Sequence, residues 1–198
     1  LIEFETHLFN LPGLFISKET KRDYLEGPYF SHLIGHTGKV STDDLKADSY
    51  YSPLDFIGKD GLEIQYEKEL RGIPAKIAVS VDSSNTVLKT LVAKEAQPGN
   101  NLILNIDGNL QKLLTDALYA KMIQTNSPGA AAVVLDVKSG KILSLVSLPN
   151  FDNNIFNKNL VKETYQELTN NKNRPFFNRA IGGFYPVGST IKPFIASA

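Results

Sequence analysis

Hydrophobic residues in the second half of the chain recur three and four positions apart, which is the spacing of one face of a helix. The pattern predicts an amphipathic helix that follows a strand at 102–106 and is capped by Asp107 or Asn109. The apolar stripe of this helix consists of Leu110, Leu113, Leu114, Ala117, Leu118 and Met122.

Two further apolar runs, 131–136 and 142–147, lie on either side of the tight turn 138–141 and predict a β-hairpin. The asparagine-rich stretch 150–173 is polar, so we expect loops there, with one helix around 161–168. Helices are therefore expected to flank an antiparallel hairpin in this half of the chain.

The first half of the chain has a less regular pattern. Alternation of polar and apolar residues at 76–82 and 86–91 predicts two strands of a half-buried sheet. The polar run 63–70 predicts a helix, a short helix is expected at 20–24, and two glycines predict a loop over 31–40.

A turn-rich stretch at 97–101 divides the chain into two predicted domains, residues 1–98 and 99–198. Strand, helix, hairpin, loop and helix follow one another in the second, which is typical of an α+β domain with helices packed on an antiparallel sheet. We expect the α+β class for the whole chain. The second domain is expected to be incomplete, because the sequence stops within an apolar helical stretch.

Charge and residue usage narrow the range of functions. The 198 residues include 21 basic and 21 acidic side chains, so the formal net charge is zero and no nucleic-acid partner is expected. The sequence contains no cysteine, which excludes disulfides and thiolate metal sites. It contains no apolar run of about 18 residues, so we expect no transmembrane helix within it.

The candidate chemistry lies in a single Ser-x-x-Lys motif, Ser189 to Lys192, followed by an apolar helical stretch. Residues three apart on a helix share a face, so the lysine amine can reach the serine hydroxyl and act as its base when neutral. Burial and the positive end of a helix lower a lysine pKa, and the serine N–H at a helix start can stabilise an oxyanion. Pro193 favours a helix that begins at about Ser189. Ser189 is the candidate nucleophile and Lys192 the candidate base.

The motif alone also allows a plainer interpretation, in which Ser189 caps the helix and Lys192 is a solvated side chain. A chain of this length contains about one Ser-x-x-Lys by chance. The run 183–190 nearly matches a phosphate-binding loop, but Ser189 stands where that loop has its lysine, so nucleotide binding is not expected.

His32 and His36 are four residues apart, as in zinc-binding helices, but glycines interrupt the helix and no acidic residue follows His32 directly. We expect His32 to be a satisfied loop or core residue. Three aspartates are expected to have structural roles, with Asp107 as a cap, Asp136 at a strand end and Asp152 in an Asx turn. Neither a metal ion nor a cofactor is therefore expected.

The residues around the motif resemble the acylation motif of class B penicillin-binding proteins. That family has Asn-Arg-Ala followed by Tyr-Pro-Pro-Gly-Ser-Thr-Phe-Lys-Pro. This chain has Asn-Arg-Ala at 178–180 and Tyr-Pro-Val-Gly-Ser-Thr-Ile-Lys-Pro at 185–193. It departs from the family pattern at Val187 and Ile191, and neither change touches the reacting groups.

Four other segments carry the same resemblance in the same order along the chain. Residues 129–154 are similar to the first hairpin of the transpeptidase domain, and residues 104–111 are similar to the strand and helix that open it. Residues 57–72 resemble the pedestal motif of the family, and residues 31–35 resemble the loop before it. The pedestal motifs favour the elongation type, penicillin-binding protein 2, over the division type.

The resemblance implies a membrane-anchored D,D-transpeptidase that cross-links peptidoglycan on the periplasmic side of the inner membrane. Ser189 would attack the D-Ala-D-Ala bond of a stem peptide with Lys192 as general base, and β-lactams would acylate the same serine. The Ser-x-Asn and Lys-Thr-Gly motifs of the family do not follow Ser189 in this sequence. We therefore expect the chain as given to be an inactive fragment whose membrane anchor precedes Leu1.

Two other functions remain open. In this family the pedestal, here residues 1–98, contacts a membrane glycosyltransferase and scaffold proteins of the elongation machinery, so the chain could serve as a non-catalytic scaffold. A β-lactam sensor would use the same serine, but sensors of that kind lack the pedestal motif, which makes this the least favoured alternative.

Overall fold

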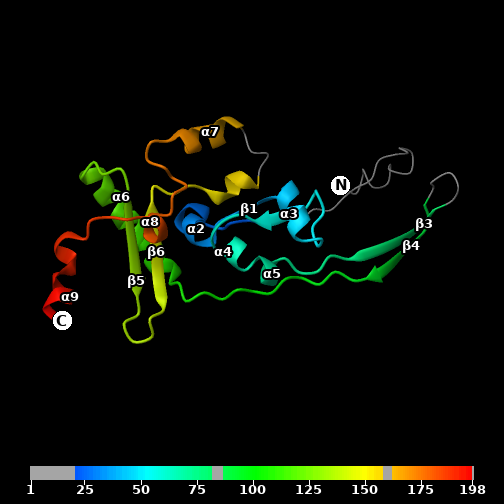
Figure 1. Cartoon of the computed structure of the whole chain (residues 1–198), viewed down its shortest axis with the longest axis horizontal. Coiled ribbons are helices and arrows are strands. Elements are labelled where there is room, and N and C mark those ends of the chain that lie inside the picture. Colours follow the sequence, from blue (N-terminus) through cyan, green and yellow to red (C-terminus); the bar gives the residue numbers. More distant parts are fainter. Residues whose placement is uncertain (1–20, 82–86, 158–161, 198) are drawn as a thin grey trace.

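The computed structural model describes residues 21–81, 87–157 and 162–197. Its N-terminal half contains α2 (Gly27–Ile34), β1 (Thr37–Lys39), α3 (Thr42–Ala47), β2 (Phe56–Gly58), α4 (Gly61–Gln65), α5 (Glu67–Leu70), β3 (Lys76–Val81) and β4 (Val87–Lys94). Its C-terminal half contains α6 (Gly108–Gln124), β5 (Ala130–Leu135), β6 (Ile142–Leu148), the 3-10 turn η2 (Asn153–Phe156), α7 (Lys162–Asn170), α8 (Arg179–Gly182), the 3-10 turn η3 (Gly188–Ile191) and α9 (Lys192–Ser197). Helices and small antiparallel sheets alternate along the chain (Figure 1), which confirms the predicted α+β class.

Within the described residues the strands form three antiparallel pairs, β1 with β2, β3 with β4, and β5 with β6. The strands predicted at 76–82 and 86–91 are confirmed, although Asp82 and Thr86 lie outside the described residues. The β3–β4 hairpin extends away from the rest of the molecule (Figure 1). The hairpin predicted from the runs 131–136 and 142–147 is also confirmed, with Ala132 opposite Val146 in its register.

The prediction of a strand at 102–106 is wrong. This segment has no strand assignment, and Ile103 is 91% exposed. The first backbone bond to the β5–β6 sheet comes at Asp107, whose N–H donates to the carbonyl of Leu143 at 2.9 Å. An extended apolar segment becomes a strand only where its backbone pairs along its length, and this one pairs only at its end.

The N-terminal helix α2 is the largest element that the pattern did not predict. The loop expected over 31–40 is wrong for most of its length, because residues 31–34 form the last turn of α2 and Thr37–Lys39 form strand β1. Gly35 ends the helix with φ of 77°, and a Cβ there would lie 1.9 Å from the carbonyl oxygen of Asp60. The short helix expected at 20–24 is not present at 21–24, and Thr20 lies outside the described residues.

The long helix α6 begins as predicted, but its fully buried residues lie outside the predicted apolar stripe, of which Leu110, Leu114, Leu118 and Met122 are half-buried. Asp107 caps it, since its Oδ1 accepts from the N–H groups of Asn109 and Leu110 at 3.0 Å each. The buried side chains are Gln111 and Thr115, whereas Leu113 of the predicted stripe is 68% exposed. The helix predicted over 63–70 is present as two helices, α4 and α5, which are separated at Tyr66. The helix predicted around 161–168 is present as α7.

The core lies where α2, α6 and β6 meet the loop that follows β6. Its buried apolar side chains include Leu145, Val146, Leu148 and Phe151. Helix α2 therefore packs on the C-terminal half, although it precedes the domain boundary predicted at 98/99 (Figure 1). None of the helices within the described ranges is long and apolar enough to cross a membrane.

Candidate functional site

Ser189 and Lys192 lie on consecutive helical turns near the end of the chain. Ser189 is in the 3-10 turn η3, and Lys192 is the first residue of α9 and donates its backbone N–H to the carbonyl of Ser189. Gly188, just before the serine, has φ of 54°, a conformation in which glycine is strongly favoured. The helical segment thus begins at Gly188, one residue earlier than predicted. Pro193 occupies the first turn of α9, where proline is tolerated.

The geometry of this turn suits a nucleophile and a base. In a 3-10 turn the side chains of residues three apart lie one above the other, so the Lys192 amine can approach the Ser189 hydroxyl. Both side chains are exposed. Within the described residues nothing buries Lys192.

Helix α8 lies six residues before Ser189 in the chain. It is held by hydrogen bonds from the backbone and the side chain of Arg179. The N–H of Arg179 donates to Ser147 Oγ at 2.9 Å, which fixes α8 to strand β6. The Arg179 guanidinium donates to the carbonyls of Arg174 at 3.2 Å and Phe177 at 3.3 Å, and also to that of Asn173. The Arg of the Asn-Arg-Ala motif therefore closes the loop before α8 onto α8 itself.

The pedestal motif forms a second cluster, around a buried carboxylate. Glu63 is 5% exposed, and its Oε1 lies 3.0 Å from Arg22 Nε. The Tyr24 hydroxyl donates to the same carboxylate at 3.4 Å and accepts from the N–H of Thr37 at 3.0 Å. Burial raises the pKa of Glu63, against the opposing effect of Arg22, and burial also raises the pKa of Tyr24 to about 12. The motif glutamate thus ties α4 to the chain that leads into α2.

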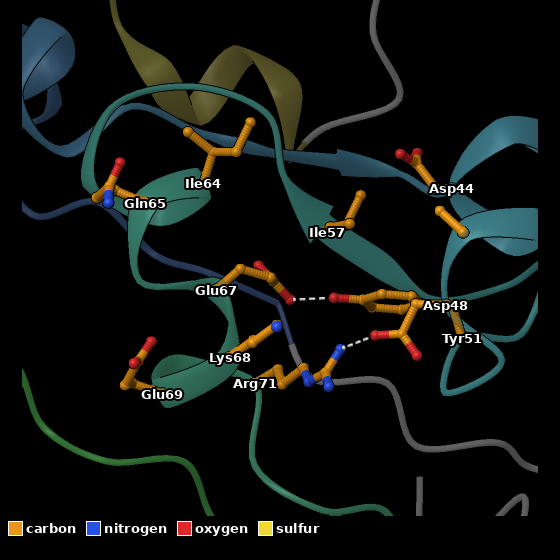
Figure 2. Close-up of a pocket in the computed structure, with 11 residues that line it drawn as sticks. Asp44, Asp48, Tyr51, Ile57, Ile64, Gln65, Glu67, Lys68, Glu69 and Arg71 are labelled. Carbon is orange, nitrogen blue, oxygen red and sulfur yellow. Dashed lines mark hydrogen bonds and ion pairs between the residues drawn. The ribbon is translucent and has the colours of Figure 1, made fainter.

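A pocket of about 390 Å³ lies beside this cluster, between α3 and α5 (Figure 2). Arg71 donates to Asp48 Oδ2 at 2.7 Å, and its guanidinium lies 3.8 Å from the ring centroid of Tyr50. The Tyr51 hydroxyl donates to Glu67 Oε1 at 2.8 Å. Asp48 and Arg71 of this wall are paired with each other, and the pocket lies in the other half of the chain from Ser189.

His32 and His36 occupy separate structural positions. His32 is buried, and its Nε2 lies 2.7 Å from the carbonyl oxygen of Pro175, which confirms the prediction of a satisfied core residue. The His36 ring stacks on Phe156 with centroids 3.6 Å apart. Burial lowers the pKa of both histidines. In the described part of the chain no cluster of three or more His, Asp or Glu is placed to hold a metal ion.

The three aspartates considered from the sequence have the structural roles expected of them. Asp107 caps α6, and Asp152 accepts from the N–H of Asn154 at 2.9 Å in the turn before η2. Asp136 ends the first hairpin strand, where it accepts from the N–H of Lys138 at 3.2 Å.

The sequence did not reveal that the asparagine-rich stretch binds the backbone of residues 24–35. Nδ2 of Asn150 donates to the carbonyl of Pro28, and Nδ2 of Asn153 to that of Gly35, each at 2.7 Å. Asn154 bonds both the N–H and the carbonyl of Tyr24 at 2.9 Å. Asparagine has both a donor and an acceptor that can imitate backbone pairing, and the abundance of asparagine was the available signal.

Proteins similar to this chain include penicillin-binding proteins of greater length. Peptidoglycan D,D-transpeptidase MrdA of Acinetobacter baumannii is 34% identical over 99% of this chain, which spans 28% of that protein. The structure of Helicobacter pylori penicillin-binding protein 2 (PBP2) in complex with MreC matches with a TM-score of 0.78 and 29% identity, over 98% of this chain and 35% of the other. Pseudomonas aeruginosa PBP2 in complex with WCK 5153 matches with a TM-score of 0.70 and 31% identity, over 89% and 34%.

Two family models account for most of the chain. The model of the penicillin-binding protein dimerisation domain matches residues 1–104, and that of the penicillin-binding protein transpeptidase domain matches residues 130–198. Their order is that of the predicted pedestal and catalytic regions. The chain therefore belongs to the penicillin-binding protein family and carries its dimerisation domain followed by the N-terminal part of its transpeptidase domain.

Proposed function

We propose that this chain belongs to a peptidoglycan D,D-transpeptidase of cell-wall elongation, with Ser189 as nucleophile and Lys192 as general base. The observation that carries the proposal is a Ser-x-x-Lys turn at a helix start, inside a segment that matches the transpeptidase domain. The names of the full-length relatives, peptidoglycan D,D-transpeptidases, support the same reaction.

In the proposed reaction Ser189 Oγ attacks the carbonyl carbon between the two D-alanines of a stem peptide, and its proton passes to Lys192 Nζ. The C–N bond then breaks, and the terminal D-alanine leaves with the proton returned from the lysine. An amine of a neighbouring peptide attacks the acyl-enzyme and releases the serine. The serine N–H lies at the start of its helical turn, and in this mechanism it would stabilise the oxyanion.

The location and partners of the protein are part of the proposal. We infer a single-pass anchor in the inner membrane, with the catalytic region on the periplasmic side, because this is the arrangement of the family that the sequence resembles. The complex of Helicobacter pylori PBP2 with MreC supports a scaffold protein as partner of the pedestal. A membrane glycosyltransferase is the second partner that the resemblance implies, and β-lactams are the inhibitors.

The direct test is the intact mass of the full-length protein after incubation with benzylpenicillin, beside a Ser189→Ala variant. We expect wild type to gain the mass of one benzylpenicillin and the variant to gain none, because the serine oxygen forms the ester. A folded wild-type protein without an adduct would refute the catalytic role and favour the non-catalytic pedestal scaffold. The 198-residue chain alone is expected not to turn over a D-Ala-D-Ala peptide, since neither Ser-x-Asn nor Lys-Thr-Gly follows Ser189 in it.

A further inference from the structure

The end of α2 and the start of α8 are joined by one side chain, that of Asn178. Nδ2 of Asn178 donates to the carbonyl of His32 at 3.1 Å, across 146 positions of sequence. Oδ1 of the same amide accepts from the N–H of Ala180 at 3.1 Å and so caps α8. One side chain thus fixes both the start of α8 and its place against the N-terminal domain.

The acceptor is well suited to this contact. The last four carbonyls of a helix have no partner within the helix, and they form its partially negative end. His32 is in the last turn of α2, so the amide of Asn178 satisfies one of these carbonyls. The His32 ring makes a second contact to the same loop through Nε2 and the carbonyl of Pro175, at 2.7 Å. The C-terminal end of α2 is therefore held at two points against the chain that leads into α8.

Helix α8 is the last element before the candidate nucleophile that bonds to the rest of the fold. It has only four residues, too few for a helix to persist without external contacts. Between its last residue and Ser189 lie six residues, 183–188, whose side chains are mainly exposed, Phe184 being 99% exposed. Only these six residues separate α8 from Ser189, so the place of α8 limits the positions that Ser189 can take.

We propose that Asn178 is a positioning residue, which couples the place of α2 in the N-terminal domain to the place of Ser189 through its bond to the His32 carbonyl. The inference rests on the proposed function, since it assigns Asn178 an influence on Ser189 acylation. It goes beyond that function because it makes the rate of the chemical step depend on a contact between the two domains. Displacement of a reacting group by about 1 Å reduces rate by up to about a hundredfold.

The test separates the two bonds of the Asn178 amide. Asn178→Asp and Asn178→Ser both keep an oxygen that can cap α8, and both remove the donor to the His32 carbonyl. Asn150→Ala is the matched control, because it removes a donor to another α2 carbonyl, that of Pro28, without contact to α8. The full-length proteins are compared by the rate of benzylpenicillin adduct formation, by melting temperature, and by hydrogen exchange over residues 179–192.

We expect both Asn178 variants to lose about tenfold in the acylation rate constant with unchanged benzylpenicillin binding before acylation, and to exchange amides at 179–192 about tenfold faster. Asn150→Ala is expected to change neither, at a similar loss of melting temperature. Equal acylation and exchange in wild type and Asn178→Ser would overturn the proposal, as would an equal loss in Asn150→Ala. If wild type forms no adduct, the proposed function fails, and the exchange of 179–192 still decides whether Asn178 holds this segment.

Discussion

The His32 ring is a titratable group placed where protonation is unfavourable. Burial lowers its pKa below the ordinary value, against a smaller opposing effect of the Pro175 carbonyl and of Asp60. The unfolded chain therefore binds a proton at a higher pH than the folded chain does, so folding stability falls as pH falls through 6.5 toward the lower folded pKa. His36, whose pKa is lowered by burial too, acts in the same direction.

We expect the free energy of unfolding to decrease between pH of about 7.5 and about 5.5, and to decrease less in a His32→Gln variant, whose amide can still donate to the Pro175 carbonyl. Urea denaturation at the two pH values measures both quantities. Glu63, whose pKa is raised by burial, has the opposite sign, since its contribution is present below its unfolded pKa and is lost as pH rises. If the free energy of unfolding depends on pH equally in wild type and in His32→Gln, then His32 does not contribute to that dependence.

At the scale of elements, α6 is joined to α2 and β6 by one buried amide, that of Gln111. Its Nε2 donates to the carbonyls of Tyr29 at 2.9 Å and Leu145 at 2.8 Å. Its Oε1 accepts from Ser144 Oγ at 2.7 Å and from the N–H of Leu145 at 2.9 Å. A side chain with four satisfied hydrogen bonds in a core fixes the mutual positions of the elements that supply its partners.

Gln111→Ala is expected to reduce the free energy of unfolding by about 3 kcal/mol, because it leaves buried polar groups without partners. Gln124→Ala, at the exposed end of the same helix, removes only a contact with Lys121 Nζ and is expected to cost less than about 0.5 kcal/mol. Chemical denaturation of both variants measures the difference. Similar values for the two variants would mean that the buried amide does not bind these elements together.

Elements whose pattern is local could be predicted from the sequence. The β5–β6 hairpin, the cap of α6 by Asp107 and the helical start at Ser189 each follow from spacing or from a single residue type. The absence of a strand at 102–106 could not be predicted from the sequence, since a strand depends on a partner that can be distant in the chain. The burial of Gln111 was missed for the same reason, because its polar partners come from α2 and β6.

The candidate site shows the same division. The residue pattern made Ser189 and Lys192 candidates for a reacting pair, and the resemblance to a family motif supplied the roles that remain proposals. Asn178 was noted only as part of that motif, since its contact with His32 joins residues 146 positions apart. A contact of that kind depends on how α2 packs, and α2 itself was not predicted.

At the scale of the whole molecule, the two domains are connected by more than the chain between them. Segment 22–35 lies against the C-terminal half, bound through the asparagines of the loop after β6, through Gln111, and through an ion pair of Glu26 with Lys112. The connecting chain is fixed at its start, where a Cβ on Gly99 would lie 2.0 Å from the carbonyl oxygen of Leu70. It is free near Ile103, which is 91% exposed.

A protease site inserted after Ile103 tests whether these contacts hold the domains together without a covalent link. Each hydrogen bond contributes about 1 kcal/mol net, and together with the apolar burial around Leu148 these bonds should outweigh the entropy lost when two separate pieces associate. We therefore expect the pieces to co-elute after cleavage in size-exclusion chromatography at micromolar concentration, with both masses in one peak. The same cleaved protein carrying Gln111→Ala should dissociate more readily. Separation of the unmutated pieces would mean that the linker, and not the contacts of α2, keeps the domains together.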